Sequence, residues 1–295
     1  MLKPLFMEPY FNIKDWGGTR LASVYGKRIP SDHTGESWEV SAHPMGVSRC
    51  EGKTLPEWID EYGAALCGTE VQGEFPLLIK LIDAREWLSV QVHPDDAYAQ
   101  RVEGDPYGKT EAWVVLDCDP GAQLIFGIDC DVETLRREIP EGRLEQHLKK
   151  VDVQVGDVLY IPAGTVHAIG ANMLIYEVQQ SSDRTYRLYA WGRNAELHIE
   201  KSLDVIDPKQ GGKPIDPKYM KEKVVSYMGI GGSDWATRIQ CDFNTQALTP
   251  KWSVIDNECF QWCLDIVMND EAIARAHAGQ GMTEVHIVGG VHPDH

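Results

Sequence analysis

Short segments of β-forming residues recur along the chain and are separated by Gly, Pro and Asp. This spacing predicts a mainly β fold, a sandwich or a barrel, rather than alternating βαβ units. No Gly-rich loop joins a strand to a helix, so a nucleotide-binding Rossmann or P-loop core is disfavoured. The expected strands cover residues 75–82, 88–93, 111–116, 122–125, 151–161 and 173–179.

Three helical segments and one linker are also expected. Thr54 and Glu57 form a capping box, which predicts a helix over residues 55–66. Two short helices fill 132–148, and another begins at Asn194 and ends at Ile206. The stretch 207–218 is rich in Pro, Gly and Lys and reads as a linker. We therefore expect a catalytic domain over 1–222 and a small C-terminal β domain over 223–295, atypical or truncated.

The chain has a formal net charge of −17, from 28 basic and 45 acidic residues. Such a surface repels nucleic acid and anionic lipid, so we expect a small molecule as its partner. An anionic partner would need a local group of cations. No apolar run reaches the ~20 residues of a membrane-spanning helix. The seven cysteines are scattered and the N-terminus lacks a signal-peptide pattern, which predicts reduced thiols and a cytoplasmic location.

Polar side chains share one face of the strand expected around residue 91. Because side chains alternate along a strand, Ser89, Gln91 and His93 point to one side and two valines to the other. A hydroxyl, an amide and an imidazole are costly on the face of a dry core. They fit a face that lines a wet cavity, with Pro94 ending the strand just beyond His93.

A tight turn precedes His167. Gly156 is followed by a Pro-Ala-Gly turn at 162–164, and His167 begins the return strand. The pattern G-x5-P-x-G-x2-H resembles the second signature of the cupin superfamily, in which the turn aims the histidine into a small barrel as a metal ligand. This resemblance implies a cupin jelly-roll barrel with a few inserted helices.

Glu111 opens another expected strand and can supply a carboxylate oxygen. Taken singly, His93, Glu111 and His167 are each more often ordinary polar residues. Together with Gln91 they provide two imidazoles, a carboxylate and an amide oxygen, a set that suits Zn²⁺ and tolerates Fe²⁺ or Mn²⁺. The sequence therefore predicts one metal ion per chain, with Zn²⁺ expected.

Six sequence stretches occur in a fixed order between about residues 5 and 205. They are DWGG (15–18), GESWEVSAH (35–43), LSVQVHPDD (88–96), GKTEAW (108–113), IPAGTVHA (161–168) and YEVQQSSDRTYRLYAW (176–191). Together they resemble the type I phosphomannose isomerases in their short bacterial form. The resemblance implies an aldose–ketose isomerase that interconverts mannose 6-phosphate and fructose 6-phosphate.

The resemblance also implies roles for individual residues. Such an isomerase moves a proton between C1 and C2 through an enediolate, so a cation near the developing negative charge lowers the barrier. The implied residues are Gln91, His93, Glu111 and His167 for the metal, Arg187, Lys109 and Glu177 for catalysis, and Ser89, Lys109 and Arg193 for substrate binding.

The identity of the base stays open at this point. Glu177 is one candidate and a metal-bound hydroxide is another. Alternatively, Glu177 has no catalytic role and forms an ion pair with Arg184 or Arg187. The two interpretations are equally supported by the sequence. We expect Arg184 itself to be a solvated surface residue.

Two other functions are compatible with a cupin metal site. One is another metal-dependent cupin enzyme, such as an iron dioxygenase, and the other is a non-catalytic sugar-binding cupin. The cations Lys109 and Arg187 favour a phosphorylated substrate over an apolar one. All four candidate ligands are present together with Arg187, which argues against a scaffold that has lost its activity.

The C-terminal part departs from the family pattern after about residue 240. Residues 272–294 look instead like a helix and strand of radical-SAM enzymes of the menaquinone-precursor type. Cys259 and Cys263 have CxxxC spacing with no third cysteine nearby, so an iron–sulfur cluster and radical chemistry are not expected.

Overall fold

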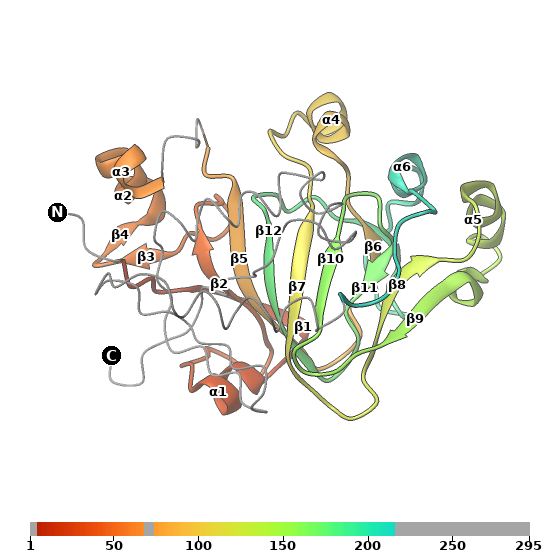
Figure 1. Cartoon of the computed structure of the whole chain (residues 1–295), viewed down its shortest axis with the longest axis horizontal. Helices are drawn as coiled ribbons and strands as arrows, with labels where there is room; N and C mark the ends of the chain where they lie inside the picture. Colours follow the sequence, from red (N-terminus) through yellow and green to blue (C-terminus); the bar gives the residue numbers. More distant parts are fainter. Residues whose placement is uncertain (1–4, 68–73, 216–295) are drawn as a thin grey trace.

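The computed structural model describes residues 5–67 and 74–215, and two antiparallel β-sheets dominate it (Figure 1). This architecture confirms the mainly β, cupin-type class expected from the sequence. In sheet order, the six-stranded sheet contains β1 (Tyr10–Gly18), β2 (Thr34–Ser41), β5 (Leu77–Ala84), β12 (Met173–Gln180), β7 (Glu111–Cys118) and β10 (Val158–Ile161). The five-stranded sheet contains β13 (Tyr186–Tyr189), β6 (Val90–Val92), β11 (His167–Ala168), β8 (Gln123–Ile128) and β9 (Leu148–Asp152).

Helices and a small hairpin cover the outer faces of both sheets (Figure 1). On the six-stranded sheet these are α1 (Arg20–Tyr25), the hairpin β3 (Arg49–Cys50) and β4 (Lys53–Thr54), α2 (Leu55–Tyr62) and α3 (Ala64–Cys67). On the five-stranded sheet they are α4 (Asp96–Tyr98) with a π-helical turn (Ala99–Glu103), α5 (Val132–Glu138) with a 3-10 turn (Leu144–His147), and α6 (Ile199–Val205).

An apolar core fills one end of the space between the sheets. Val115, Leu159 and Ile175 of the six-stranded sheet pack there against Leu124 and Phe126 of β8. Each fully buried aliphatic side chain of this kind contributes about 1.5–3 kcal/mol. Side-chain alternation directs the intervening residues of the same strands outward, toward the covering helices.

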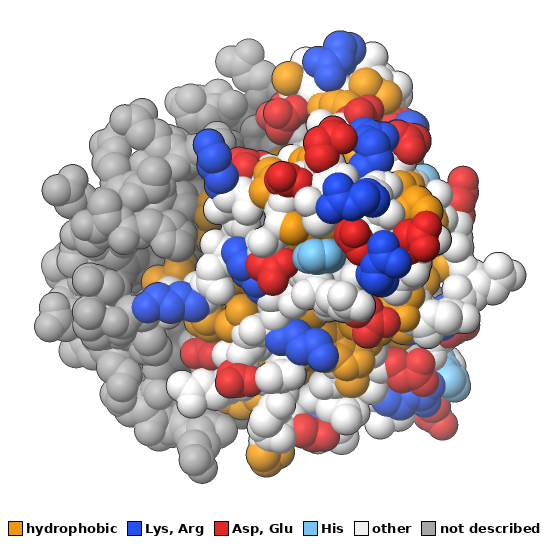
Figure 2. Space-filling view, turned by 90° about the vertical axis from the view of Figure 1, so that its right-hand side faces the viewer, with side chains coloured by type: hydrophobic (Ala, Val, Ile, Leu, Met, Phe, Trp, Pro, Cys, Tyr) orange, Lys and Arg blue, Asp and Glu red, His pale blue; other side chains and the backbone are white. Residues whose placement is uncertain are grey.

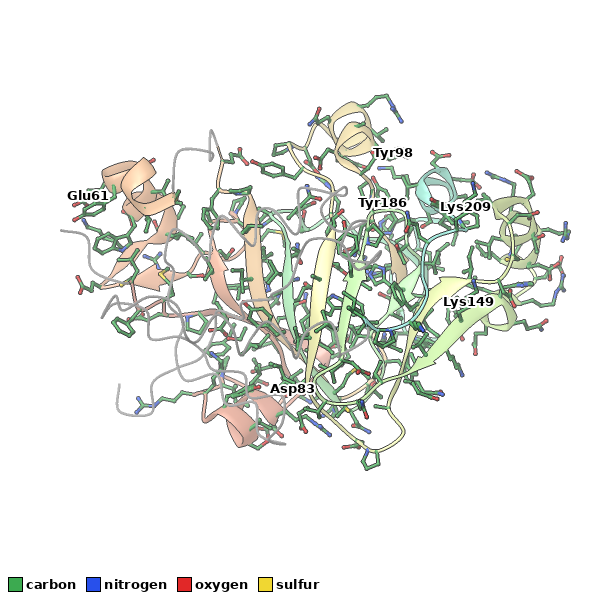
Figure 3. All side chains as sticks on the ribbon, viewed as in Figure 1. Glu61, Asp83, Tyr98, Lys149, Tyr186 and Lys209 are labelled. Atoms are coloured by element: carbon green, nitrogen blue, oxygen red, sulfur yellow. The ribbon has the colours of Figure 1, made fainter. Side chains whose placement is uncertain are left out.

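The opposite end of the same inner face is polar. Along β12, Ile175 lies in the apolar core, and Glu177 and Gln179 follow on the same side. The register sets Glu177 between Lys80 of β5 and Trp113 of β7. Figure 3 shows both ends of the sandwich: Asp83, near the end of β5, lies at one end, and Tyr98 and Tyr186 lie toward the other. The polar end is therefore where β6 ends and β7 and β13 begin.

Local signals predicted some elements and misplaced others. The capping box forms as expected, with Glu57 N donating to Thr54 Oγ1 (3.3 Å), and α2 ends at Gly63. The expected strand 151–161 is wrong, because β9 and β10 belong to different sheets and a turn at Gly156 separates them. The helix expected from Asn194 is also wrong at its start, since α6 begins only at Ile199.

Several other expectations concern residues outside the described ranges. The domain boundary at 222/223, the C-terminal β domain and the 272–294 segment stay predictions. Within residues 5–67 and 74–215, the four cysteines are all unpaired. No helix in these ranges is long and apolar enough to cross a membrane. Acidic and basic side chains are interspersed over the face that carries α5 and α6 (Figure 2).

Candidate metal centre

His93, Glu111 and His167 meet at the polar end of the sandwich, and their ligand atoms all lie within 4.8 Å of one another. We call these three residues the metal cluster. His93 directly follows β6, Glu111 opens β7, and His167 opens β11. The cluster therefore combines residues from both sheets, and each of its side chains is at most 1% exposed.

Backbone carbonyls fix both imidazole rings. His93 Nδ1 donates to the carbonyl oxygen of Arg184 (2.9 Å), and His167 Nδ1 donates to that of Thr165 (2.9 Å). Because a carbonyl oxygen can only accept, each Nδ1 carries a hydrogen, and the neutral form of such a ring presents a lone pair on Nε2. Burial, aided by the Lys109 ammonium, lowers the pKa of His93 to about 3, so this imidazole is neutral at pH 7.

Glu111 is fully buried and ionised. Burial opposes its charge, but Lys109 and the two imidazoles hold the pKa of the Glu111 carboxyl well below its usual range. Glu111 Oε1 lies 3.2 Å from His167 Nε2, and Oε2 lies 3.6 Å from His93 Nε2. Among the described residues, no donor makes a well-aligned hydrogen bond to either carboxylate oxygen.

Gln91 adds an amide to this group from β6. Its Cα is paired with that of His167 across the sheet, and its Nε2 lies 3.3 Å from His167 Nε2. The oxygen and nitrogen ends of an amide exchange places by rotation about the last side-chain bond. Gln91 can therefore turn an oxygen toward the metal cluster.

Lone pairs thus converge on one buried point. Two Nε2 atoms and a carboxylate without aligned hydrogen-bond donors face the same point, an arrangement that a bound metal ion would satisfy. Imidazole and carboxylate are ligands that Zn²⁺, Fe²⁺ and Mn²⁺ accept. The residues present therefore fit a divalent metal ion, and the carbonyl partners of both histidines are the outer contacts typical of such sites.

Lys109 lies directly beside the metal cluster. Its Nζ is 3.2 Å from Glu111 Oε2 and 3.2 Å from His93 Nε2. Lys109 and Glu111 are two residues apart in the sequence, and both side chains reach the same point. A buried cation here can also meet negative charge on a bound molecule.

Glu177 sits in a second buried polar group next to the cluster. Its Oε1 is 3.0 Å from Lys80 Nζ, and its Oε2 accepts from Trp113 Nε1 (2.8 Å). Burial and the negative charge of Glu111 raise the pKa of Glu177, although Lys80 and Lys109 oppose this shift. The alternative of an ion pair with Arg184 or Arg187 is wrong in its partner, which is Lys80, a residue that sequence reasoning missed.

The sequence does contain a signal for Lys80, because it is the one charged residue in the apolar run FPLLIKLI at 75–82. Its ammonium lies against the ring of Trp38 (5.6 Å to the centroid), and the charge of Glu36 also raises the pKa of Lys80. Glu36 in turn accepts from Trp38 Nε1 (2.9 Å) and Asn12 Nδ2 (3.0 Å). These residues extend the polar end of the sandwich to β1 and β2.

Arg187 and Ser89 lie on the strands beside the cluster. The Cα of Arg187 in β13 is paired with that of Gln91, so both side chains share the inner face. Among the described residues, the Arg187 guanidinium has no ion pair or hydrogen bond. Ser89 Oγ is 3.5 Å from Gln91 Oε1. Both residues are partly accessible and can meet a molecule that binds at the polar end.

Arg193 and Arg184 each pair with a carboxylate outside the metal cluster. Arg193 Nη1 lies 3.9 Å from Glu86, and no described contact joins it to the metal cluster. Arg184 is more than a solvated surface residue, because its side chain forms an ion pair with Asp105 and its carbonyl oxygen holds His93.

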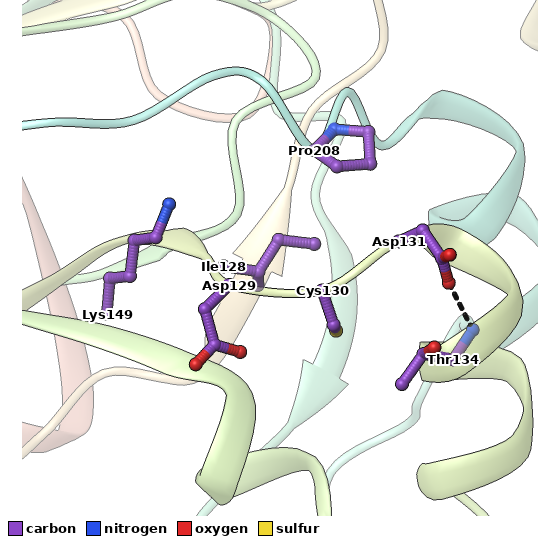
Figure 4. Close-up of a pocket in the computed structure, with 7 residues that line it drawn as sticks. All are labelled: Ile128, Asp129, Cys130, Asp131, Thr134, Lys149 and Pro208. Atoms are coloured by element: carbon purple, nitrogen blue, oxygen red, sulfur yellow. Dashed lines mark hydrogen bonds between the residues drawn. The ribbon is translucent and has the colours of Figure 1, made fainter.

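A second group of ligand-type side chains lies beyond the end of β8. The ligand atoms of Asp129, Cys130 and His147 also fall within 4.8 Å of one another. Here His147 Nδ1 already pairs with Asp129 Oδ1 (3.1 Å), and the Asp129 side chain is 57% exposed. Lys149 lines the adjoining pocket of about 490 Å³ and opposes a second cation there (Figure 4). The buried cluster is therefore the stronger metal candidate.

Known proteins share both the sequence and the fold. A family model described as the type I phosphomannose isomerase catalytic domain matches residues 5–110. The mannose-6-phosphate isomerase of Streptococcus mutans is 46% identical over 218 residues, which cover 70% of this chain and 68% of that protein. The Bacillus subtilis mannose-6-phosphate isomerase ManA is 44% identical with the same coverage.

The crystal structure of a mannose 6-phosphate isomerase from Bacillus subtilis aligns with a TM-score of 0.68 at 40% identity. The alignment covers 72% of this chain and 71% of that one. Sequence similarity, fold and family model point to the same family. The chain belongs to the type I phosphomannose isomerase family.

Proposed function

We propose that the chain interconverts mannose 6-phosphate and fructose 6-phosphate. Support comes from its family and from one observation above all: a buried cluster of lone-pair donors flanked by the cations Lys109 and Lys80 and the base candidate Glu177. The reaction moves one proton between C1 and C2 and one between their oxygens. The intermediate is an enediolate, whose negative charge these cations can stabilise.

We assign one Zn²⁺ per chain to Gln91, His93, Glu111 and His167. The neutral imidazole of His93, the carbonyl-held ring of His167, the ionised carboxylate and the rotatable amide support this ligand set. A bound divalent cation would supply Lewis-acid stabilisation of negative charge on the substrate oxygens.

Glu177 is our candidate for the base. A carboxylate with a raised pKa takes up and returns a carbon-bound proton more effectively than an ordinary one. In this role Glu177 removes the proton from C2 and delivers it to C1. Its contacts with Lys80 and Trp113 hold the two oxygens in place, so the group meets the substrate in one orientation.

Arg187 and Lys109 provide fixed positive charge. A guanidinium presents several donors in one plane and stays protonated, which suits an enediolate oxygen or a phosphate. Ser89 can donate a hydroxyl at the same end of the sandwich. Arg193 is a further substrate-binding candidate from the family resemblance, and its ion-pair partner in the structure is Glu86.

A coupled assay for fructose 6-phosphate formation from mannose 6-phosphate tests the function. We expect turnover that a chelator abolishes and added Zn²⁺ restores. His167→Ala should lose metal and turnover together. The matched control is His147→Ala, since His147 lies outside the metal cluster and pairs with exposed Asp129.

Two results would overturn the proposal. One is full turnover in protein shown by metal analysis to be free of metal. The other is iron-dependent O₂ uptake without isomerisation, which would favour the dioxygenase alternative. Binding of the sugar phosphate without turnover would favour a non-catalytic cupin.

A further inference from the structure

Two connecting segments meet at the polar end of the sandwich. The first, residues 94–109, joins β6 to β7 and carries α4 and the π-helical turn. The second, residues 181–185, joins β12 to β13 and so passes from one sheet to the other. The first segment begins directly after His93 and ends just before Glu111. The first segment therefore lies between two metal-cluster residues in the chain.

An ion pair ties the two segments together. Arg184 of the second segment pairs with Asp105 of the first through Nε and Oδ2, and through Nη2 and Oδ1 (3.2 Å). Arg184 Nη1 also lies 3.8 Å from Glu103 Oε2. This two-point contact between planar groups fixes orientation as well as distance.

The acidic side of this contact is itself held in place. Glu103 Oε1 accepts from Tyr186 Oη (2.7 Å) and from Lys201 Nζ (2.7 Å). Glu103 closes the π-helical turn, and Gly104 then adopts a left-handed conformation with φ of 75° that turns the chain toward Asp105. Arg184 therefore docks onto an ordered surface.

The same residue holds a metal ligand through its backbone. The carbonyl oxygen of Arg184 accepts from His93 Nδ1 (2.9 Å), and this bond sets both the tautomer and the rotation of the ring. Within its own segment, Arg184 N donates to Ser182 Oγ (3.2 Å). The start of the segment is anchored as well, because Ser181 N donates to the carbonyl oxygen of Pro76 (2.7 Å) and Gln179 Nε2 donates to that of Ser182 (2.7 Å). The Asp105 pair is the side-chain contact that ties Arg184 itself to the first segment.

We propose that Arg184 is a positioning residue for His93, acting through its ion pair with Asp105. The pair keeps the Arg184 carbonyl within hydrogen-bonding distance of Nδ1, so that Nε2 stays directed toward Glu111 and His167. This inference rests on the proposed metal-binding role of His93. It makes metal retention depend on a contact that touches neither metal nor substrate.

Partial exposure makes the effect sensitive to salt. The Arg184 and Asp105 side chains are 40% and 26% exposed, so dissolved ions reach their pair. Metal loss from the natural protein should therefore become faster as ionic strength rises. A variant that lacks the pair should show a flatter salt dependence.

The test measures zinc loss from the full-length, zinc-loaded protein to a chromogenic chelator. Arg184→Gln and Asp105→Asn should each speed the loss severalfold, below the roughly 10–100-fold that removal of a direct partner of a metal ligand costs. Combining both changes should add little, because both remove the same contact. Arg184→Lys keeps the positive charge but cannot make the two-point contact. Its rate of zinc loss should therefore lie between the rates of the unsubstituted protein and of Arg184→Gln.

Arg136→Gln is the matched control. Arg136 is similarly exposed (44%) and pairs with Glu200 (2.8 Å) between α5 and α6, away from the metal cluster. The Arg136→Gln variant should lose zinc at the rate of the unsubstituted protein. Spectra of the Co²⁺-loaded proteins add a second readout, since a displaced imidazole alters the bands in Arg184→Gln and not in Arg136→Gln.

The positioning role would be refuted if Arg184→Gln and Asp105→Asn both lost zinc at the rate of the unsubstituted protein. An equal acceleration of zinc loss in Arg136→Gln would also refute it. If Arg184→Gln fails to fold, Asp105→Asn and Arg184→Lys decide. His167→Ala separates this inference from the function proposed above. If it retains zinc, the metal assignment itself is wrong; if it loses zinc while the Arg184 and Asp105 variants do not change, only the positioning role is wrong.

Discussion

Buried charges at the polar end of the sandwich occur in contact with opposite charges. Lys80 pairs with Glu177, and Lys109 pairs with Glu111, with all four side chains at most 8% exposed. Burying such groups costs several kcal/mol each, and pairing repays this only in part. Apolar residues of similar size would serve stability as well. The charges are therefore better explained by chemistry at this end than by folding.

Replacing Lys80 with Met tests the role of Glu177. Lys80 lowers the pKa of Glu177 against burial and the charge of Glu111, so its removal raises that pKa further. A base works only when ionised, and activity is lost as pH falls through its pKa. The acid limb of the kcat/KM profile should therefore move to higher pH. A limb that stays in place in folded Lys80→Met protein would rule out Glu177 as the group that controls it.

Arg187→Ala should separate catalysis from metal binding. The guanidinium shares a face with Gln91 but contacts no metal-cluster residue, so zinc content should be unchanged. Turnover should fall by about 10²–10³, the usual loss when a preorganised donor is removed from developing negative charge. Metal analysis and steady-state kinetics on the same preparation check both parts. Arg136→Ala is the control, and full activity in Arg187→Ala would contradict the assignment.

The residues of the site differ in how far sequence could predict them. Strand alternation indicated Gln91 and His93, and a turn motif indicated His167, because these signals are local. The Lys80–Glu177 pair depends on the register between β5 and β12, which are almost 100 residues apart in the chain. No local pattern encodes that register, so the partner of Glu177 could not be predicted.

At the scale of elements, the turn before His167 connects both histidines. Gly164 N donates to the carbonyl oxygen of His93 (2.9 Å), and Asp207 N donates to that of Gly164 (3.0 Å). Gly164 has a φ of +87°, and a Cβ added there would meet the carbonyl oxygen of Val205 at 3.0 Å. The glycine is therefore needed both for conformation and for close approach.

Gly164→Ala should lower the melting temperature and speed zinc loss. Gly121→Ala is a matched control, because Gly121 has a similar φ of +79° but open space around its Cα. Both variants carry the left-handed backbone cost of about 1–2 kcal/mol. Gly164→Ala alone should disturb the contact with His93. Equal zinc loss in the two variants would show that the turn does not position the cluster.

Element boundaries show where sequence patterns stop being informative. Residues 151–161 have the composition of one strand, yet the chain crosses there from the five-stranded to the six-stranded sheet. Gly156, with a φ of +92°, makes the break, and Asp157 Oδ2 accepts from Gln154 N (2.9 Å) across it. Strands in both sheets have one face toward the same core, so composition does not distinguish them. The α2 capping box was predictable because all its partners are local.

At the scale of the whole molecule, the metal cluster joins the two sheets. Glu111 belongs to the six-stranded sheet, whereas Gln91 and His167 belong to the five-stranded sheet and His93 follows β6. The apolar core holds the sheets together at the other end. A metal ion bound among these ligands would link the two sheets at the polar end. A bound metal should therefore stabilise the whole sandwich.

The final prediction concerns this coupling between metal and stability. A ligand that binds the folded state alone stabilises it by RT ln(1 + [L]/Kd), about 4.1 kcal/mol when free metal exceeds Kd a thousandfold. Chelation should therefore lower the melting temperature of the natural protein, and added Zn²⁺ should restore it. In His167→Ala the difference should vanish, whereas His147→Ala should keep it, since His147 lies outside the cluster. Calorimetry with and without chelator measures the shift. Equal melting temperatures in the natural protein would mean that no metal bridges the sheets, while a shift that persists in His167→Ala would locate the stabilising ion elsewhere in the chain.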